Sequence, residues 1–330
     1  MSILTRLFKL IKNEKGSVII IAAVAMTTIL GFTALVTDIG LIYLNRVNLM
    51  NTADSAALAG AQRMAESDQF SAESTARQYV TLNDNTLPPE NIDVNINTND
   101  KTATVTLNKE VAMCFARVLN IYTSNVTAKA KATYEYPTAI SQVKNGNIFP
   151  LFLSKNIYDK TLKEDGFIDE SVVIGLMGSD NKHVKINDSQ IEGNWGGLYF
   201  GEDEFTAALE GTLTKKLTLK AGTWYEEGTK PGSMGGEVAD AVNYRLDPKN
   251  GIKSYGLIPI IDKVEEKQGG KVKVHIAGFA VYQILGVEKT PPGYTIYGHL
   301  LNNKSISDFF GETSSDEIYN YGSHVYMLIE

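Results

Sequence analysis

The segment Ser17–Thr37, SVIIIAAVAMTTILGFTALVT, is the feature around which the rest of the chain is organised. It runs for 21 residues without Asp, Glu, Lys, Arg or His. An α-helix of this length is about 31 Å long, which matches the hydrocarbon core of a bilayer. We therefore predict a transmembrane helix over residues 17–37.

The charges that flank this segment predict its orientation. Four basic residues between Arg6 and Lys15 precede it, and Asp38 follows it directly. Basic residues are retained on the cytoplasmic side of a membrane. Residues 1–16 are therefore predicted to be a cytoplasmic basic segment, and the bulk of the chain is predicted to be extracytoplasmic.

The apolar segment has two other interpretations. A cleaved secretory signal has an apolar region of about 7–15 residues that ends at a small-residue cleavage site, whereas here the helical pattern continues past Thr37. A buried core helix is the second alternative, but 21 residues without a charge is long for one. A retained membrane anchor fits the sequence best.

Composition limits the partners and the covalent framework. The chain carries a net charge of −7, and the residues before Ser17 contribute +3 from four basic residues and Glu14, so the rest carries −10. An acidic extracytoplasmic part argues against nucleic acid as a partner. The one cysteine, Cys114, excludes an internal disulfide, and its apolar neighbours VAMCFARVL predict a buried core thiol.

The helical pattern continues beyond the apolar segment to about Glu66, and small residues recur along it at intervals of four. Such residues let another element approach closely, although alanine also favours helix by itself. We expect this face to pack against the protein's own sheet in preference to another chain. The predicted helix packing face comprises Ala53, Asp54, Ala57, Gly60 and Ala61.

Local patterns beyond Glu66 predict an α+β fold: the N-terminal transmembrane helix continues into an extracytoplasmic helix packed on a small antiparallel sheet, and a mostly β C-terminal domain follows. Alternating apolar residues indicate a hairpin, and a strand over 271–287 is predicted to bend at Gly278. In the first domain we predict helices over 71–82 and 111–120, and strands over 92–96, 102–107 and 126–136. The predicted domains are residues 38–136 (α+β), 137–146 (linker) and 147–330 (mostly β).

The side chains that carry chemistry are scattered along the sequence. No HExxH, CxxC or GxSxG pattern occurs. We therefore predict that the protein is not an enzyme and has no catalytic residue, metal site or cofactor. Convergence of the histidines with carboxylates would favour an anchored hydrolase, and exposed aromatics around Trp195, Trp224 and Tyr225 would favour sugar binding. The histidines are His183, His275, His299 and His324.

The N-terminal part also carries a family pattern. The residues that form it are Gly16 before the apolar segment, then Asp38, Gly40, Arg46, Leu49 and the alanine-rich run from Ala53 to Ala61. With the later segment KTATVTLNKEVAMCFARVLNIYTSNVTAKAKATYE, this pattern resembles the TadE/TadG-like family of tight-adherence (Flp) pilus assembly proteins over residues 13–136.

The resemblance implies a bacterial, single-pass protein of the cell envelope, with residues 38–136 as a pilin-like domain. The partners it implies are the lipid bilayer and pilins or other pilus assembly proteins, while the oligomeric state stays open between a homo- and a hetero-oligomer. Many relatives carry a von Willebrand type A domain downstream, but its metal motif is missing here. Cleavage after Gly16 would place Ile21 where related pilins have Glu at the fifth mature position, so we predict no processing.

Two hypotheses of function follow. The leading one is a non-enzymatic, membrane-anchored component of a Tad/Flp-type pilus assembly or secretion apparatus, which uses the N-terminal helix for anchoring and packing and the outer domains for protein contacts. The alternative is an anchored cell-surface adhesin or sugar-binding protein that acts through the C-terminal β domain.

Overall fold

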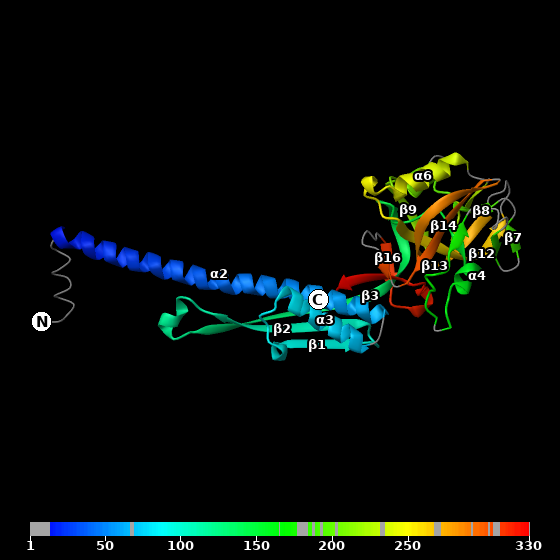
Figure 1. Cartoon of the computed structure of the whole chain (residues 1–330). Helices are drawn as coiled ribbons and strands as arrows, with labels where there is room; N and C mark the ends of the chain where they lie inside the picture. The colour runs from blue at the N-terminus through cyan, green and yellow to red at the C-terminus, as the bar shows by residue number, and fades with distance from the viewer. Residues whose placement is uncertain are drawn as a thin grey trace. The chain divides into compact units, whose positions relative to one another are not determined.

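The computed structural model describes residues 14–66, 69–164, 166–176, 184–186, 189–191, 194–201, 204–231, 235–266, 272–291, 293–302, 304–305 and 311–329 (Figure 1). Most of the predicted basic segment 1–16, together with His183, lies outside these residues. The chain divides into two compact units, which are described separately. Unit 1 is Met1–Ala132 with Leu328–Glu330, and unit 2 is Thr133–Met327.

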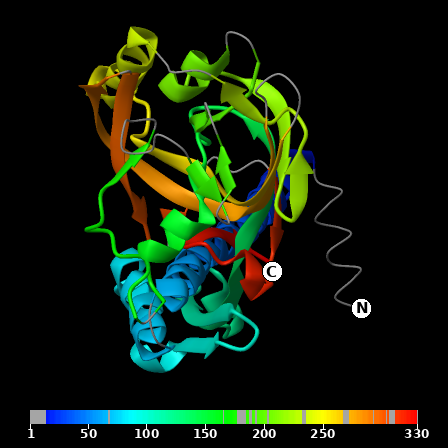
Figure 2. The same ribbon diagram turned by 90° about the vertical axis from the view of Figure 1, so that its right-hand side faces the viewer.

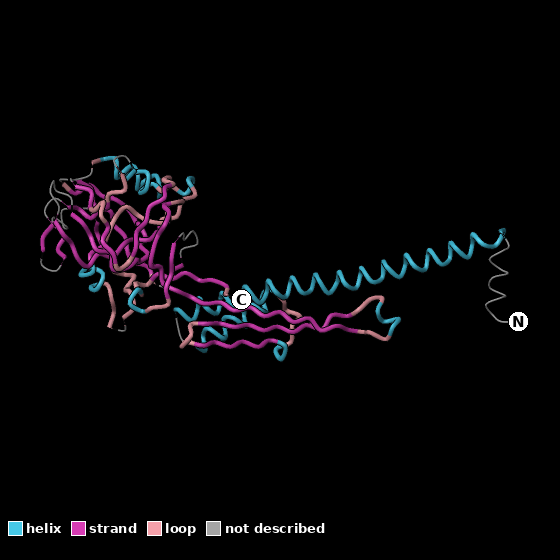
Figure 3. Tube along the Cα trace, turned by 180° about the vertical axis from the view of Figure 1, so that it is seen from behind, coloured by secondary structure: helices cyan, strands magenta, loops and turns pink. Residues whose placement is uncertain are grey.

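A single helix dominates unit 1. Helix α2 (Glu14–Glu66) continues without a break for 53 residues, as predicted, and is therefore about 80 Å long (Figure 3). Its most apolar part has a mean hydropathy of 2.4 and none of that part is buried. By length and composition, it is the one helix among the described residues that could cross a membrane.

The outer half of α2 packs on a second helix and a small sheet. Helix α3 (Gln69–Asn83) follows the predicted position, and strands β1 (Ile92–Asn97) and β2 (Thr102–Ala112) form the predicted antiparallel hairpin. Strand β3 (Thr123–Val143) pairs with β2, which gives the sheet order β1-β2-β3. Apolar residues alternate on these strands, so one face of the sheet is buried against the helices.

Three details differ from the sequence prediction, two in unit 1 and one at the start of unit 2. The helix predicted over 111–120 is a strand end followed by one 3-10 turn, η2 (Ala116–Leu119), because Val111 and Met113 continue the inward alternation of β2. Cys114 then faces outward, so the prediction of a buried thiol is wrong: the side chain is exposed. The segment predicted as a linker, 137–146, is strand as far as Val143.

Unit 2 is mostly β, as predicted (Figure 2). Its largest sheet has the order β4-β12-β13-β14-β5, with β10 beside β13, and it is antiparallel except where β12 pairs with β4. Two apolar clusters cover the sheet. The strands are β4 (Leu153–Ser154), β5 (Ile174–Leu176), β6 (Val184–Ile186), β7 (Ser189–Ile191), β8 (Asn194–Leu198), β9 (Lys215–Lys220), β10 (Thr223–Tyr225), β11 (Thr229–Pro231), β12 (Tyr255–Glu266), β13 (Val272–Thr290), β14 (Gly293–Leu301), β15 (Lys304–Ser305), β16 (Gly311–Ser314) and β17 (Ser323–Leu328). The helices are α4 (Lys155–Lys160), α5 (Glu204–Glu210) and α6 (Gly236–Leu246).

Gly278 and Arg245 bring separate segments of unit 2 into close contact. The register of β12 and β13 shifts next to Gly278, where the bend was predicted, and a Cβ there would lie 2.2 Å from the Tyr321 ring. The guanidinium of Arg245 on α6 is buried and donates hydrogen bonds to the carbonyl oxygens of Leu209 (2.6 Å), Gly146 (3.2 Å) and Lys253 (3.2 Å). A single buried cation thus connects helix α5 with the two loops that contain Gly146 and Lys253.

Candidate functional site

The inner half of α2 is an apolar surface that the described protein leaves uncovered. All of its large aliphatic and aromatic side chains from Val18 to Val36 are exposed. The hydroxyls of Thr27, Thr28, Thr33 and Thr37 donate hydrogen bonds to the carbonyl four residues earlier, at 2.8–2.9 Å. Because each polar side chain is satisfied within the helix, the surface suits an environment without water.

Asp38 marks the point where α2 begins to contact the rest of unit 1. Its carboxylate is 6% exposed and accepts hydrogen bonds from the backbone N–H groups of Cys114 (2.8 Å), Phe115 (3.1 Å) and Ala116 (2.6 Å). Burial raises the pKa of this carboxyl, but the three N–H donors and nearby Arg117 outweigh that effect, so the pKa lies below its ordinary value of 3.8. The carboxylate therefore holds the start of η2 against the helix.

The predicted helix packing face lies inside unit 1. Ala53, Ala57 and Ala61 have no exposed surface, and Asp54 is half-buried. A Cβ placed on Gly60 would lie 3.2 Å from the Cβ of Ala76 and 3.3 Å from that of Ala103. Helix α3 and the β1–β2 hairpin of the same chain therefore cover this face, and they approach α2 most closely where it has no side chain.

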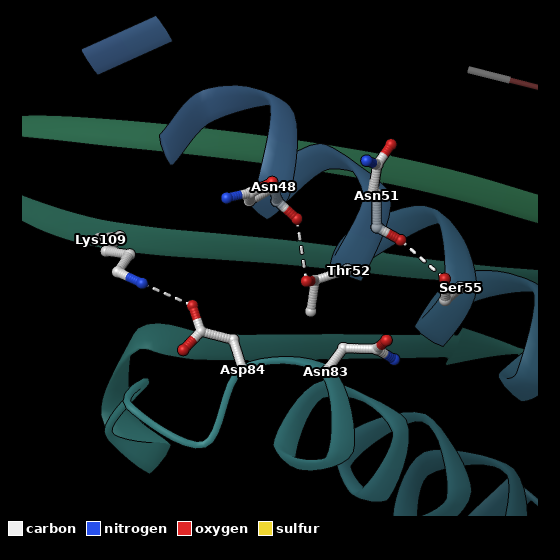
Figure 4. Close-up of a pocket in the computed structure, with 7 residues that line it drawn as sticks. All are labelled: Asn48, Asn51, Thr52, Ser55, Asn83, Asp84 and Lys109. Atoms are coloured by element: carbon white, nitrogen blue, oxygen red, sulfur yellow. Dashed lines mark hydrogen bonds and ion pairs between the residues drawn. The ribbon is translucent and has the colours of Figure 1, made fainter. Parts of the chain in front are cut away.

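A polar pocket of about 410 Å³ opens between α2, α3 and β2 (Figure 4). Lys109 Nζ forms an ion pair with Asp84 Oδ2 at 2.6 Å. Burial raises the pKa of Asp84, but Lys109 and Thr86 lower it more, so this carboxyl stays ionised. The hydroxyl of Thr52 donates a hydrogen bond to the backbone carbonyl oxygen of Asn48 at 2.9 Å. The residues that line the pocket are Asn48, Asn51, Thr52, Ser55, Asn83, Asp84 and Lys109.

The pocket groups offer hydrogen bonds rather than catalysis. Its one cation and its one carboxylate neutralise each other, and its lining contains neither a histidine nor a second carboxylate. General acid–base chemistry would require a group whose pKa lies near neutrality. The pKa of Asp84 is instead lowered from its ordinary value, away from neutrality. Across the described residues, no group of three His, Cys, Asp or Glu side chains could hold a metal ion.

The described histidines of unit 2 lie apart in three environments. His275 Nδ1 lies 2.5 Å from Asp262 Oδ1, and His299 Nε2 lies 3.1 Å from Gln283 Oε1. His324 is buried beside aromatic rings. The convergence that an anchored hydrolase would require is not found among these three.

Of the aromatic residues named from the sequence, the two whose side chains the structure describes, Trp224 and Tyr225, do not form one exposed surface. Trp224 is 39% exposed and packs edge-on against His275 at 5.4 Å between ring centroids. Tyr225 is buried, and its hydroxyl donates to the carbonyl oxygen of Tyr199 at 2.6 Å. The side chain of Trp195 lies outside the described part of the chain. The described side chains therefore do not favour the sugar-binding alternative.

Comparison with known proteins singles out the helix that carries Asp38. Residues 16–63 match the family described as putative Flp pilus-assembly TadE/G-like. We call residues 16–63 the TadE/G-like segment, after the family that they match. It contains the apolar surface, Asp38 and the helix packing face, and it ends close to the end of α2. No curated protein and no solved structure matches the chain.

The match confirms the resemblance to Flp pilus assembly proteins over the TadE/G-like segment, while its extension to residue 136 stays a prediction. The sequence marks Asp38 as the charge after the apolar span and as part of the family pattern, but it did not predict the contact with η2. The available signal was a lone carboxylate directly after an apolar span. Its three N–H partners lie 76 to 78 residues away in the sequence.

Proposed function

We propose that this chain is a non-enzymatic, single-pass membrane component of a Tad/Flp-type pilus assembly or secretion apparatus. The observation that carries the proposal is the coincidence of the TadE/G-like segment with a helix whose inner half is apolar and uncovered. In this proposal residues 17–37 form the anchor, and the domains that follow it make contacts with pilins or other assembly proteins.

The energetics of the inner half support anchoring. Burial of a large apolar side chain stabilises by about 1.5–3 kcal/mol. Eleven such side chains between Val18 and Val36 are exposed. Covering all of them completely with lipid would therefore contribute at most about 17–33 kcal/mol relative to water. Arg6, Lys9, Lys12 and Lys15 before the span favour an orientation with the N-terminus in the cytoplasm and the chain beyond Thr37 outside it.

Because the helix packing face is buried, less of the surface of α2 is available to a partner protein. Ala53, Ala57 and Ala61 are covered by the chain itself, so a second subunit would meet α2 along its uncovered inner half. Small and β-branched residues on that half, including Ala22, Ala23 and Gly31, permit close helix–helix contact in a membrane. We propose that this surface packs beside pilin or assembly-protein helices.

The test is photo-crosslinking in native membranes, followed by mass spectrometry. A photo-reactive residue at Val24, in the uncovered half, is expected to form adducts with pilins or pilus membrane proteins. The matched control at Thr98, in the exposed β1–β2 turn, should not form them. If Val24 forms adducts with lipid alone, the helix anchors the chain but does not contact assembly proteins, and this result would contradict the proposal.

A further inference from the structure

The loop between β2 and β3 has an apolar tip that is exposed to an unusual degree. We define the β2–β3 tip as residues 115–122. Val118 is 85% exposed and Leu119 is 75% exposed. The other large apolar side chains of the tip that are exposed are Phe115, Ile121 and Tyr122. Contiguous apolar exposure of this kind marks an interaction site with protein or membrane.

Most backbone N–H groups of the tip have a hydrogen-bond partner, either within the turn or in the Asp38 carboxylate. Val118 N–H donates to Phe115 at 3.0 Å, Asn120 N–H to Arg117 at 3.0 Å, and Ile121 N–H to Ala116 at 3.1 Å. Below the turn, Met113 N–H donates to the carbonyl oxygen of Tyr122 at 2.9 Å. Each N–H group that is already paired lowers the cost, in lost hydrogen bonds with water, of moving the tip into a lipid interface.

Asp38 fixes the tip at one level along α2. The carboxylate binds the N–H groups of residues 114–116, and Asp38 is the first residue after the predicted span. The helix surface on the outer side of this point remains apolar and exposed at Ile39, Tyr43 and Leu44. The tip is therefore held at the level of α2 where the predicted span ends, and exposed apolar residues of the helix lie on both sides of that level.

We propose that the β2–β3 tip inserts into the extracytoplasmic interface of the lipid bilayer as a second membrane contact beside the transmembrane helix. The proposal rests on the anchoring in the proposed function, because that anchoring sets the depth of Asp38. The composition of the tip fits a lipid interface: aliphatic side chains can enter the acyl region, Tyr122 can lie at the headgroups, and Arg117 can reach a phosphate.

This contact would restrict how unit 1 tilts on the membrane. A single helix leaves its outer part free to rotate and tilt, whereas a second attachment beside Asp38 sets one orientation of the sheet relative to the membrane surface. The β1–β2 turn lies at the other end of β2, which is 11 residues and therefore about 36 Å long. That turn should stay in water.

The test is depth-dependent fluorescence quenching in the full chain, reconstituted in phosphatidylcholine vesicles that contain no other protein. With Cys114 replaced by Ser, an environment-sensitive dye is attached through Leu119→Cys, Thr98→Cys or Val24→Cys in separate samples. Nitroxide lipids labelled near the headgroup serve as quenchers. We expect several-fold stronger quenching and a blue-shifted emission at position 119 compared with position 98, and protection from water at position 24.

The outcomes separate the two proposals. Protection at position 24 with position 119 as accessible as position 98 would overturn the tip contact and leave the anchor intact. If position 24 is also accessible to water, both proposals fail. A tip that is accessible in vesicles but forms adducts with a second protein in native membranes would assign the surface to a protein partner and overturn its assignment to lipid.

Discussion

Replacing Gly60 by valine tests whether the TadE/G-like helix is locked into unit 1 by close packing. A Cβ at this position would lie 3.2 Å from the Ala76 Cβ, 3.3 Å from the Ala103 Cβ and 3.5 Å from Ile96 Cδ1. Favourable carbon–carbon contacts lie at about 3.5–4.0 Å. The β-carbon alone would therefore require shifts of a few tenths of an ångström, and the two further methyl groups would require more.

Two effects compete in this variant. Removing a helical glycine favours the helix by a few tenths of a kcal/mol, since valine has the better propensity. Overpacking a filled core costs about 1–3 kcal/mol. Because the overpacking cost exceeds the gain in helix propensity, unit 1 should lose about 1–3 kcal/mol of stability. Gly40→Val is the matched control in the same helix, because a Cβ at Gly40 meets nothing within 4 Å.

Hydrogen exchange measured by mass spectrometry can locate this effect. Both tryptophans, Trp195 and Trp224, belong to unit 2 and cannot report on unit 1. The amides of α3 and the β1–β2 hairpin should exchange about 5- to 150-fold faster in Gly60→Val, since 1.4 kcal/mol corresponds to a factor of ten. Unchanged exchange in Gly60→Val, or equal acceleration in Gly40→Val, would refute the close-packing argument.

Three further changes have defined outcomes. Asp38→Asn should speed exchange of the amides of residues 114–116 at pH 7. Because the pKa of Asp38 is lowered in the folded protein, the stability that its carboxylate contributes is present above about pH 4 and is lost as the pH falls through the lowered pKa. The exchange rates of variant and wild type should therefore converge in acid. A persistent difference at low pH would exclude the carboxylate as the cause. Arg245→Met should destabilise unit 2 by about 3 kcal/mol or more in urea unfolding followed by Trp224 fluorescence, because three backbone carbonyls lose a buried donor; wild-type stability would show that water replaces the guanidinium. Gly278→Ala should cost about 1–3 kcal/mol by the same assay, since its Cβ would overlap an aromatic ring, and a neutral result would mean that the ring moves freely.

The sequence predicts the helices and the hairpin of unit 1 well because each has a strong local period. Helix α2 keeps helix-forming residues as far as Glu66, and β1 and β2 alternate cleanly between apolar and polar residues. The prediction over Val111 to Asn120 is wrong because it relies on the same kind of local pattern, and the apolar spacing there also fits a helix. Its true structure depends on the continued ladder of β2 and on a left-handed residue, Asn120, which ends the turn.

Long-range contacts could not be predicted from local patterns. The partners of Asp38 and the segments joined by Arg245 are set by tertiary structure. From sequence alone, a charged residue is expected at the surface. The polar pocket combines residues from α2, α3 and β2 that share no motif. The helix packing face is different in kind, because a regular spacing of small residues is a local pattern that can be read from the sequence without any tertiary contact.

Counting surface pili is the most direct test of a role in pilus assembly. Cells that lack this chain should lose Flp-type pili, and expression of the wild-type chain should restore them. A chain in which Leu30 and Leu35 are replaced by Asp should accumulate outside the membrane fraction and fail to restore them, because charged residues at the bilayer core oppose insertion. Normal numbers of pili in cells without the chain would contradict the proposed function.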